Sequence, residues 1–303
     1  MKELKNEGIK ITGALFKFNK KKIMKSSDSL KSKKFIWFII LSFLHFFILS
    51  FDSCQVPNQG CTDVNATNFD VTASKQTIPN TCSYPKLILQ IFPYWDSFRL
   101  STSTIYPIGS SGDSIRILNA QMYFSNVNLF DSNNKPLAIT DSLLIYRAND
   151  SLNVPQNLFL NNSNTVLYSL FSLNTVQNYR GFQIDAGLDA ASQQAVAKRN
   201  PSGNPLAQQS ISMYDTTSSK YYFQKMTLER HKKNFITDTI IVNGQQNFSL
   251  TYSINTSLTK GFSLTVPLQI NYSKLFNNVD IRADSATRQN KIWSNLKNCI
   301  TLQ

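Results

Sequence analysis

Histidine and glutamate are nearly absent from the larger part of this sequence. After Cys54 the chain holds a single histidine, His231, and a single glutamate, Glu229. His231 stands between Arg230 and Lys232, and these neighbouring cations disfavour the imidazolium that a general base must form. The chain also lacks GxGxxG, Walker-type, HExxH and CxxC motifs. We therefore expect no catalytic residues and predict that the protein is not an enzyme.

Acidic residues are also few, and 31 Lys and Arg against 18 Asp and Glu give a formal net charge of +13. The excess is concentrated in residues 1–34, which hold eleven of the lysines. From Cys54 onward the basic residues are spread thinly, and the cluster at residues 230–233 fits a solvated strand end. We therefore expect no nucleic-acid partner.

Charged residues are missing altogether from residues 35–51, a run of hydrophobic side chains. Lys33 and Lys34 stand directly before the run, and Ser53 and Cys54 follow it. A cationic lead, an apolar run, a small residue and a cysteine are typical of a lipoprotein export signal. Cleavage before Cys54 would make this cysteine the lipidated N-terminus. We therefore expect an exported lipoprotein held by its lipid in the outer membrane or in a membrane facing the periplasm.

An uncleaved membrane anchor is the alternative for this stretch. Its 17 residues are at the lower limit for crossing a bilayer core, and Lys34 also suits an anchor with its N-terminus inside. Phe51 and Asp52 are unusual in a lipoprotein cleavage motif. The start of translation is also open, because Met24 begins a signal of more ordinary proportions than Met1 does.

Four regions follow from this reading: a basic cytosolic lead at 1–34, the signal or hydrophobic segment at 35–53, a tether at 54–83 and one domain at 84–303. The exported part has about 250 residues, enough for one sizeable β domain.

Only four cysteines occur in the chain. Besides Cys54, Cys61 and Cys82 bracket a short polar loop, and an oxidising compartment favours a disulfide between them. The sequence around Cys61 resembles a short Cys-bracketed motif of secreted bacterial proteins that begins GCTD. Cys299 is left over on one apolar helical face, so we expect a buried free thiol there. The other members of that face are Ile292, Leu296 and Ile300.

From Pro85 onward, apolar and polar residues alternate with period two, as in antiparallel strands that are buried on one side. The clearest runs are 87–91, 248–254 and 262–272. Between 115 and 129 the parity changes twice, which predicts β-bulges near Leu118 and near Ser125 and Asn126. Pro267 lacks a backbone donor and therefore predicts a sheet edge or a bulge at its position.

Two helices are expected to interrupt the strands. Residues 188–199 have Asp189 as a cap and end before Pro201, and residues 283–300 have Asp284 as a cap. The expected fold class is all-β: an antiparallel, sandwich-like domain with two short helices, one of them C-terminal.

Several segments occur in the order seen in MbnP-like domains, which are copper-binding domains named after the methanobactin-associated periplasmic protein. The most specific are MYFSNVNLF at 122–130 and FQIDAGL at 182–188. The resemblance covers about residues 85–302, and it implies an exported, β-rich, sandwich-like domain with copper as a cofactor.

Copper sites in this family use histidine, with a Trp-derived ligand in some members, and this chain departs from the motifs that supply them. Pro93 stands at the expected first-strand histidine, Asp215 stands at a usual tryptophan, and residues 286–288 offer no histidine. Cu(I) prefers His, Met or Cys ligands. His231 and Met213 are the candidates that remain, together with Met122 and Met226.

We therefore predict a membrane-anchored binding protein with a degraded metal site. The alternative is a structural or adhesion-type surface protein that has kept the fold without a metal. The sequence does not identify a protein partner.

Overall fold

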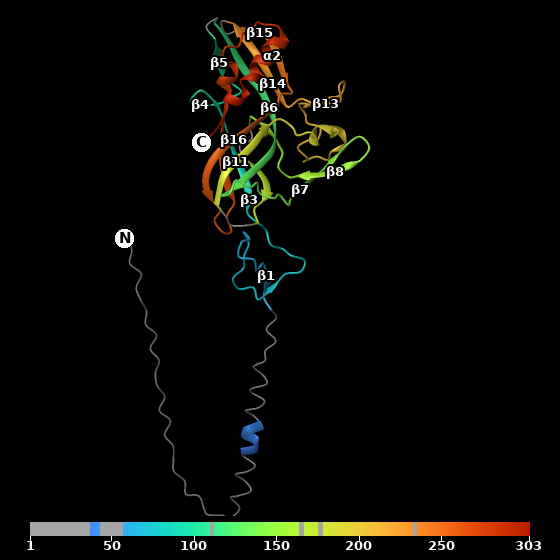
Figure 1. The fold of residues 1–303 in the computed structure, drawn as a ribbon, viewed down its shortest axis with the longest axis vertical. Coiled ribbons are helices and arrows are strands. Elements are labelled where there is room, and N and C mark those ends of the chain that lie inside the picture. Colours follow the sequence, from blue (N-terminus) through green and yellow to red (C-terminus); the bar gives the residue numbers. More distant parts are fainter. Residues whose placement is uncertain (1–36, 43–56, 110–111, 164–166, 175–177, 233–234) are drawn as a thin grey trace, which may run out of the picture. The chain divides into compact units, whose positions relative to one another are not determined.

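The computed structural model describes residues 37–42, 57–109, 112–163, 167–174, 178–232 and 235–303 (Figure 1). The chain divides into two units, Met1–Val56 and Pro57–Gln303. In the first unit, residues 37–42 are helical and exposed. The rest of the predicted export signal, including Cys54, lies outside the described residues. Among the helices that the structure describes, none is both long enough and apolar enough to span a bilayer.

The second unit is a β-sandwich built from two main sheets (Figure 1). Sheet I has the strand order β10-β3-β17-β18, with β4 paired to β3. Sheet II has the order β15-β14-β6-β11-β16, with β5 and β9 also paired to β6. The strands of sheet I are β3 (Lys86–Trp95), β4 (Phe98–Arg99), β10 (Leu167–Ser172), β17 (Leu264–Asn271) and β18 (Ile300–Leu302). Those of sheet II are β5 (Ile105–Ile108), β6 (Asp113–Asp131), β9 (Phe159–Asn162), β11 (Asn178–Ala186), β14 (Gln224–Lys232), β15 (Phe235–Gly244) and β16 (Phe248–Ser257).

The long strand β6 bends at both predicted bulges. Asn119 and Ile117 of β6 pair with two residues that are consecutive in β14. Leu118, which lies between them, therefore has no partner of its own and is the extra residue of the bulge. Against β11, the register shifts again between Ser125 and Asn128, and Asn126 adopts a positive φ of 50°. Each bulge inserts one residue and switches which side chains face the core, as the double change of parity predicts.

Strands β3 and β17 pair in parallel, from Leu264 opposite Leu87 to Asn271 opposite Tyr94. The fold is the predicted all-β sandwich with mostly antiparallel pairing, and this parallel pair within sheet I is a detail that the sequence did not predict. Pro267 lies in β17 directly before the three residues that pair with β18. Pro267 has no backbone N–H to donate, and it lies just outside the part of β17 that pairs with β18. This is an edge position, as predicted.

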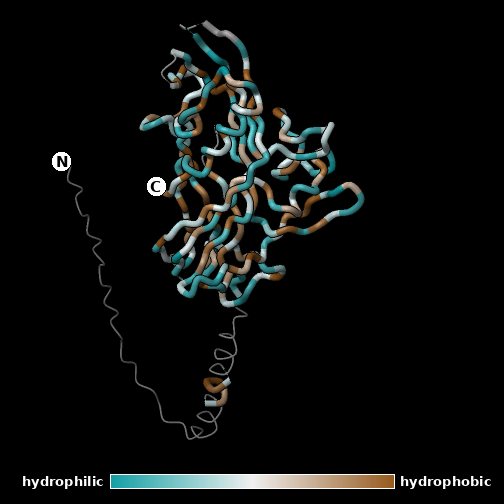
Figure 2. Tube along the Cα trace, turned by 45° about the horizontal axis from the view of Figure 1, so that its top comes forward, coloured by the Kyte–Doolittle hydropathy of each residue, from teal (hydrophilic) through white to brown (hydrophobic). Residues whose placement is uncertain are grey.

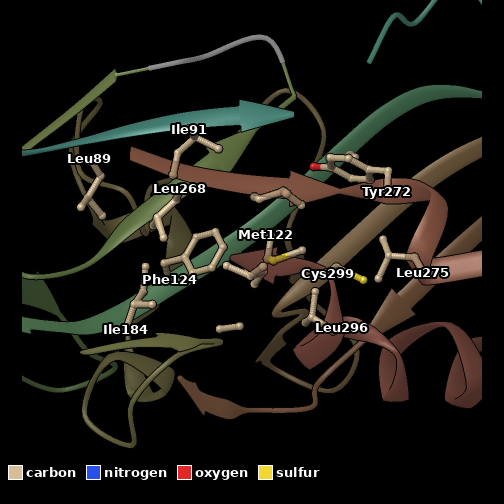
Figure 3. Packing of buried hydrophobic residues seen from close by; sticks show 14 of the residues in the cluster. Leu89, Ile91, Met122, Phe124, Ile184, Leu268, Tyr272, Leu275, Leu296 and Cys299 are labelled. Carbon is tan, nitrogen blue, oxygen red and sulfur yellow. The ribbon is translucent and has the colours of Figure 1, made fainter. Parts of the chain in front are cut away.

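The core fills the space between the two sheets. Hydrophobic and hydrophilic residues alternate along the strands (Figure 2). Leu89, Ile91 and Leu268 project from sheet I toward Met122 and Phe124 of sheet II (Figure 3). Each of these side chains is at most 2% exposed. Full burial of such a side chain stabilises the fold by about 1.5–3 kcal/mol.

The C-terminal helix α2 (Ser285–Ser294) begins as predicted, because the Asp284 side chain accepts a hydrogen bond from the Thr287 amide at 3.0 Å. It ends earlier than residue 300. A 3₁₀ turn, η4 (Leu296–Asn298), and strand β18 follow it, and Cys299 faces the core beside Leu296 (Figure 3).

The predicted helix at 188–199 is wrong, because two 3₁₀ turns occupy this segment, η1 (Ser192–Gln194) and η2 (Ala197–Arg199). Asp189 does act as a cap, since its carboxylate accepts from the Ala191 and Ser192 amides. Beyond η1 the chain turns extended at Val196, whose amide donates to the Tyr146 carbonyl at 2.9 Å. Pairing with strand β7 therefore replaces the next helical turn.

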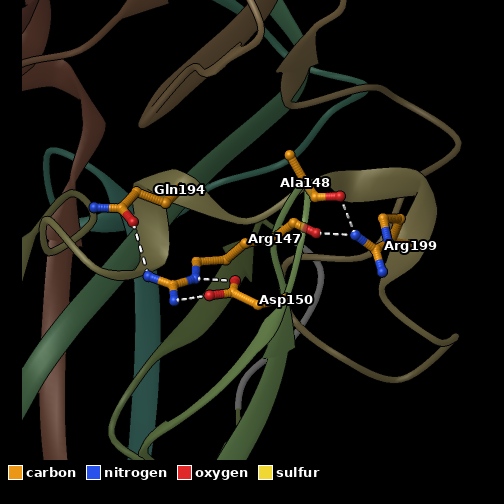
Figure 4. Close-up of polar contacts among 5 residues, drawn as sticks. All are labelled: Arg147, Ala148, Asp150, Gln194 and Arg199. Atoms are coloured by element: carbon orange, nitrogen blue, oxygen red, sulfur yellow. Dashed lines mark hydrogen bonds and ion pairs between the residues drawn. The ribbon is translucent and has the colours of Figure 1, made fainter.

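Strands β7 (Ser142–Tyr146) and β8 (Ser151–Pro155) form a hairpin that these turns hold (Figure 4). Arg147 donates to Asp150 at 2.6 Å and to Gln194 at 3.0 Å. Arg199 donates to the carbonyls of Arg147 and Ala148. The hairpin and the turns share a small second hydrophobic core with the segment that precedes β14.

Residues 57–83 form a small module with the parallel strands β1 (Gln59–Gly60) and β2 (Lys75–Gln76). Cys61 and Cys82 are disulfide-bonded, as predicted. The Tyr84 hydroxyl donates to the Asp63 carboxylate at 2.9 Å, just before β3 begins. The disulfide and this hydrogen bond therefore both hold the loop that contains Cys61 and Asp63 at the start of the module.

Candidate functional site

The predicted ligand His231 lies on β14 in an ionic cluster. Its side chain is almost fully buried, and Nε2 lies 3.4 Å from the Glu229 carboxylate. Glu229 is also paired with Arg116, at 2.8 Å from Nε and 2.5 Å from Nη2. Within the described residues, neither imidazole nitrogen has a hydrogen-bond partner. The cluster contains one carboxylate and one guanidinium but no second ligand of the kind that copper prefers.

Met213 lies outside β14, near the start of this strand, whereas His231 lies near its end. The structure therefore does not bring the two residues together. The Met213 carbonyl accepts from the Tyr222 amide at 2.8 Å, just before β14 begins at Gln224. Seven residue steps along the strand lead from Gln224 to His231, a distance of roughly 23 Å at 3.3 Å per residue. The proposed His231 and Met213 pair therefore cannot bind one metal ion.

The other two methionine candidates are also distant from His231. Met122 pairs with Gln224 across the sheet, and Met226 lies two residues further along β14. Both are buried in the main core, while Met213 is buried in the smaller one. In the part of the chain that the structure describes, no three His, Cys, Asp or Glu residues are grouped to hold a metal ion.

The first-strand motif ends at a hollow of about 530 Å³ beside Trp95 and Asp96. Pro93 is buried on the core side of β3, where the family motif places a histidine. The Trp95 ring stacks on Tyr106, with centroids 4.3 Å apart, and contacts Phe276 at 5.7 Å. Trp95 is therefore a core aromatic residue at the rim of this hollow.

A second hollow, of about 370 Å³, lies where Asp215 approaches α2 and the end of β15. We call it the amide hollow, because amide side chains predominate in its lining. The lining residues are Asp215, Ser218, Tyr222, Asn243, Gly244, Gln245, Gln246, Gln289 and Asn290. Asp215 occupies the position of a family tryptophan, and α2 contains the positions 286–288 where a histidine is often found.

Asp215 is positioned by the hairpin of β12 (Tyr214–Asp215) and β13 (Lys220–Tyr221). Its carboxylate accepts from the Ser218 hydroxyl at 2.7 Å and from the Thr217 amide at 2.9 Å. These hydrogen bonds, with that from Ser218 the strongest, hold the pKa of Asp215 below its ordinary value. The carboxylate is therefore ionised at neutral pH, and two local donors already occupy part of its hydrogen-bonding capacity.

Behind Gly244 the polar groups are incompletely paired. A Cβ on Gly244 would come within 2.6 Å of Trp293 Nε1 and 2.8 Å of Gln224 Oε1. Neither atom has a hydrogen-bond partner within the described chain, and the same is true of Asn243 Oδ1 and Gln246 Oε1. A buried polar atom left unpaired costs about 1–3 kcal/mol, and of these four buried atoms only Asn243 Oδ1 and Gln246 Oε1 belong to residues that line the hollow.

The sequence analysis missed these amides. Asn243, Gln245 and Gln246 belong to the run NGQQN at 243–247, whose polar composition and glycine indicate an ordinary turn. Gln224 is fully buried although it begins a strand. Their convergence depends on a pairing between β14 and β15 that joins Gln224 to Gly244, which periodicity alone does not reveal.

Cys299 is a free, buried thiol, as predicted. Its Sγ donates to the Asn295 carbonyl at 3.1 Å. Burial raises the pKa of Cys299 to about 12, so it is a protonated core residue at neutral pH and a poor metal ligand.

Comparison with known proteins agrees with the resemblance. The family model described as MbnP matches residues 84–294, more than half of the chain. The structure is similar to that of MbnP from Methylosinus trichosporium, with a TM-score of 0.42 and 15% sequence identity over 65% of this chain and 79% of that one. Among curated proteins, none matches this chain. Because this match covers more than half of the chain, from just before β3 to the end of α2, the chain belongs to the MbnP family.

Proposed function

We propose that this chain is an exported, membrane-anchored lipoprotein that acts by binding and whose MbnP-type domain has lost its copper site. The observation that supports the loss is the chemistry of the two hollows beside the family motif positions. None of the described residues that line them is a histidine, cysteine or methionine. Copper sites need such donors, and a carboxylate or an amide is a weak substitute for Cu(I).

The placement of His231 supports the same proposal. At least five residue steps along β14 separate it from every methionine candidate, and its imidazole lies 3.4 Å from Glu229, which is paired with Arg116. A single buried imidazole without a second soft ligand gives no chelate. We therefore assign His231 to the ionic cluster of sheet II and not to a metal site.

Binding rather than catalysis is proposed for a related reason. Glu229, the one glutamate after Cys54, is held by Arg116. Among the described lining residues, the Ser218 hydroxyl donates to the Asp215 carboxylate at 2.7 Å, but the lowered pKa of Asp215 makes this carboxylate a weak general base. The membrane attachment is proposed from the sequence of residues 31–54, with Cys54 as the lipidated residue.

The proposal is tested on full-length protein purified from its native membrane. Competition titration against a Cu(I) chelator, with a parallel spectroscopic Cu(II) titration, is expected to show no tight site, and His231→Ala is expected to leave the result unchanged. Mass spectrometry of the same preparation is expected to find a diacylated Cys54 at the N-terminus. Tight one-to-one copper binding would contradict the loss of the site, and an intact 35–51 segment would favour the uncleaved anchor.

A further inference from the structure

We propose that this chain forms a symmetric dimer, in which strand β16 pairs antiparallel with the same strand of a second copy. The contact uses the edge of sheet II that lies opposite to β15. It is independent of copper binding and goes beyond the proposed function.

Strand β16 leaves one side of its backbone unpaired. It is the last strand of sheet II and pairs only with β11 (Figure 1). Apart from that pairing, the backbone of residues 248–257 makes no hydrogen bond within the described chain. Alternate residues of a paired strand direct their N–H and C=O groups to opposite sides, so about half of these residues present both groups outward. An extended strand of another chain can pair with them.

The other edges of the two sheets carry features that oppose such pairing. On β15, the exposed Asp238 forms an ion pair with Arg230 at 2.8 Å and places a charge on that edge. On β10, the register with β3 shifts between Ser169 and Ser172, and β18 has only three residues. Charges, bulges and short strands are the means by which proteins prevent pairing at a sheet edge. By contrast, β16 contains no charged residue, proline or glycine, and its first six residues pair with β11 in regular register.

The core is open along the same edge. Four apolar side chains of β16 pack against the core, but each of them is only half-buried. Their cross-strand partners on β11 are fully buried. The half-buried residues are Phe248, Leu250, Tyr252 and Ile254, and the buried partners of the first three are Ala186, Ile184 and Phe182. A further strand beside β16 would cover this row, and removal of its apolar area from water is favourable.

The alternation along β16 fits a second copy of the same strand. A two-fold axis perpendicular to the sheet keeps the core face of both copies on one side, so the apolar row of one copy continues that of the other. In a register centred on Thr251, Leu250 of one copy lies opposite Tyr252 of the other, and Ser249 lies opposite Ser253. Pairs of these types stabilise antiparallel sheets. Because the strand is uncharged, two copies of this basic chain do not repel each other there.

The size of the contact is sufficient for a weak, specific dimer. The ten residues of β16 extend over roughly 34 Å, and the edge of a two-layered sandwich is about 15 Å deep with its side chains. The contact therefore buries roughly 500 Å² on each copy, or roughly 1,000 Å² in total, which is at the lower limit for a specific interface. A two-fold axis along the membrane normal keeps both copies in one membrane, so the pairing is compatible with the proposed anchor.

The oligomeric state of full-length protein, in detergent with micelles in excess, tests the inference. Density-matched analytical ultracentrifugation should show a monomer that converts to a dimer with a dissociation constant of about 10 µM. Thr251→Lys places two like charges across the contact and should raise this constant by at least about tenfold. Thr239→Lys is the matched control, because Thr239 is exposed on β15 at the opposite edge of sheet II, and it should leave the constant unchanged.

Hydrogen exchange provides a second measurement that needs no variant. The amides of residues 248–253 should exchange more slowly at protein concentrations above the dissociation constant than below it, whereas those of β15 should not change. A monomer at every concentration, or a dimer that Thr251→Lys leaves intact, overturns the inference. A stoichiometric complex of the β16 edge with a different protein, without a dimer of this chain, also overturns it.

Discussion

At the scale of single residues, Gly244 is the described glycine at which an added methyl group would make the closest contact. A methyl group there would lie 2.4 Å from Cδ1 of Trp293, well inside the contact distance of two carbon atoms. Trp293 is almost fully buried and cannot move outward without disturbing α2. Glycine at this point therefore allows β15 and α2 to pack directly against each other.

Gly244→Ala is expected to destabilise the protein by about 1–3 kcal/mol through overpacking, measured as the free energy of unfolding in urea. The matched background is Trp293→Leu, which removes the indole that the new methyl group meets. In that background Gly244→Ala should cost much less, because the coupling between two contacting residues appears as non-additivity. Equal costs in both backgrounds would show that the clash with Trp293 is not the cause.

At the scale of elements, the features predicted best were those encoded by local alternation. The two bulges of β6 were read from changes of parity at Leu118 and at Ser125 and Asn126, and a bulge alters parity at its own position in the chain. The cap of α2 was similarly local, since Asp284 bonds an amide three residues away. Such features need no information about distant partners.

Features that depend on distant partners were missed. The segment 188–199 has a cap and a helical spacing of apolar residues, but the Tyr146 carbonyl binds the Val196 amide and extends the chain there. The parallel pairing of β3 with β17 joins strands about 180 residues apart. Period-two alternation reports that one face of a strand is buried and not which strand lies beside it.

The candidate site was predictable only in what it lacks. The absence of histidine at Pro93 and at 286–288, and of tryptophan at Asp215, could be predicted from the sequence, and the lining of both hollows agrees with it. The amide hollow could not be predicted, because Gln224 and Gln246 are brought together by strand register and by a side-chain bond to a backbone carbonyl.

The module at 57–83 provides a prediction for acid pH. The Asn65 amide and the Tyr84 hydroxyl hold the pKa of Asp63 below its ordinary value of 3.8. A lowered pKa in the folded state contributes stability that is present above 3.8 and is lost as the pH falls through the lowered value. Tyr84→Phe should raise the pKa of Asp63 toward 3.8 in an NMR titration of the carboxyl group. Tyr94→Phe is the control and should leave the pKa of Asp63 unchanged. If Tyr84→Phe also leaves it unchanged, the Tyr84 hydroxyl does not lower this pKa.

At the scale of the whole molecule, the two sheets are joined where their edge strands meet. The Tyr252 hydroxyl on β16, the edge of sheet II, donates to the Ile300 carbonyl on β18, the edge of sheet I, at 2.9 Å. Tyr252 belongs to a set of ionisable groups that the sandwich keeps neutral by burial. The other members are Tyr123, Tyr221, Tyr272 and Cys299.

Burial of these groups predicts a loss of stability at alkaline pH. Desolvation raises the pKa of Tyr252 to about 12 from 10.0, and that of Cys299 to about 12 from 9.0. A raised pKa in the folded state contributes stability that is fully present below the unfolded value and is lost as the pH rises through the folded one. The free energy of unfolding in urea should therefore fall steadily between pH 9.0 and about pH 12.

Tyr252→Phe separates the hydrogen bond from the titration. At neutral pH it should cost about 1 kcal/mol, because the Ile300 carbonyl loses its donor. Above pH 10.0 it should reduce the slope of stability against pH, because one group that ionises preferentially in the unfolded chain has been removed. Ultraviolet absorbance of tyrosinate, followed in the folded protein, reports the titration directly. A slope identical to that of the unmodified protein would mean that Tyr252 ionises equally in both states, and that its burial between the two sheets does not hold it neutral.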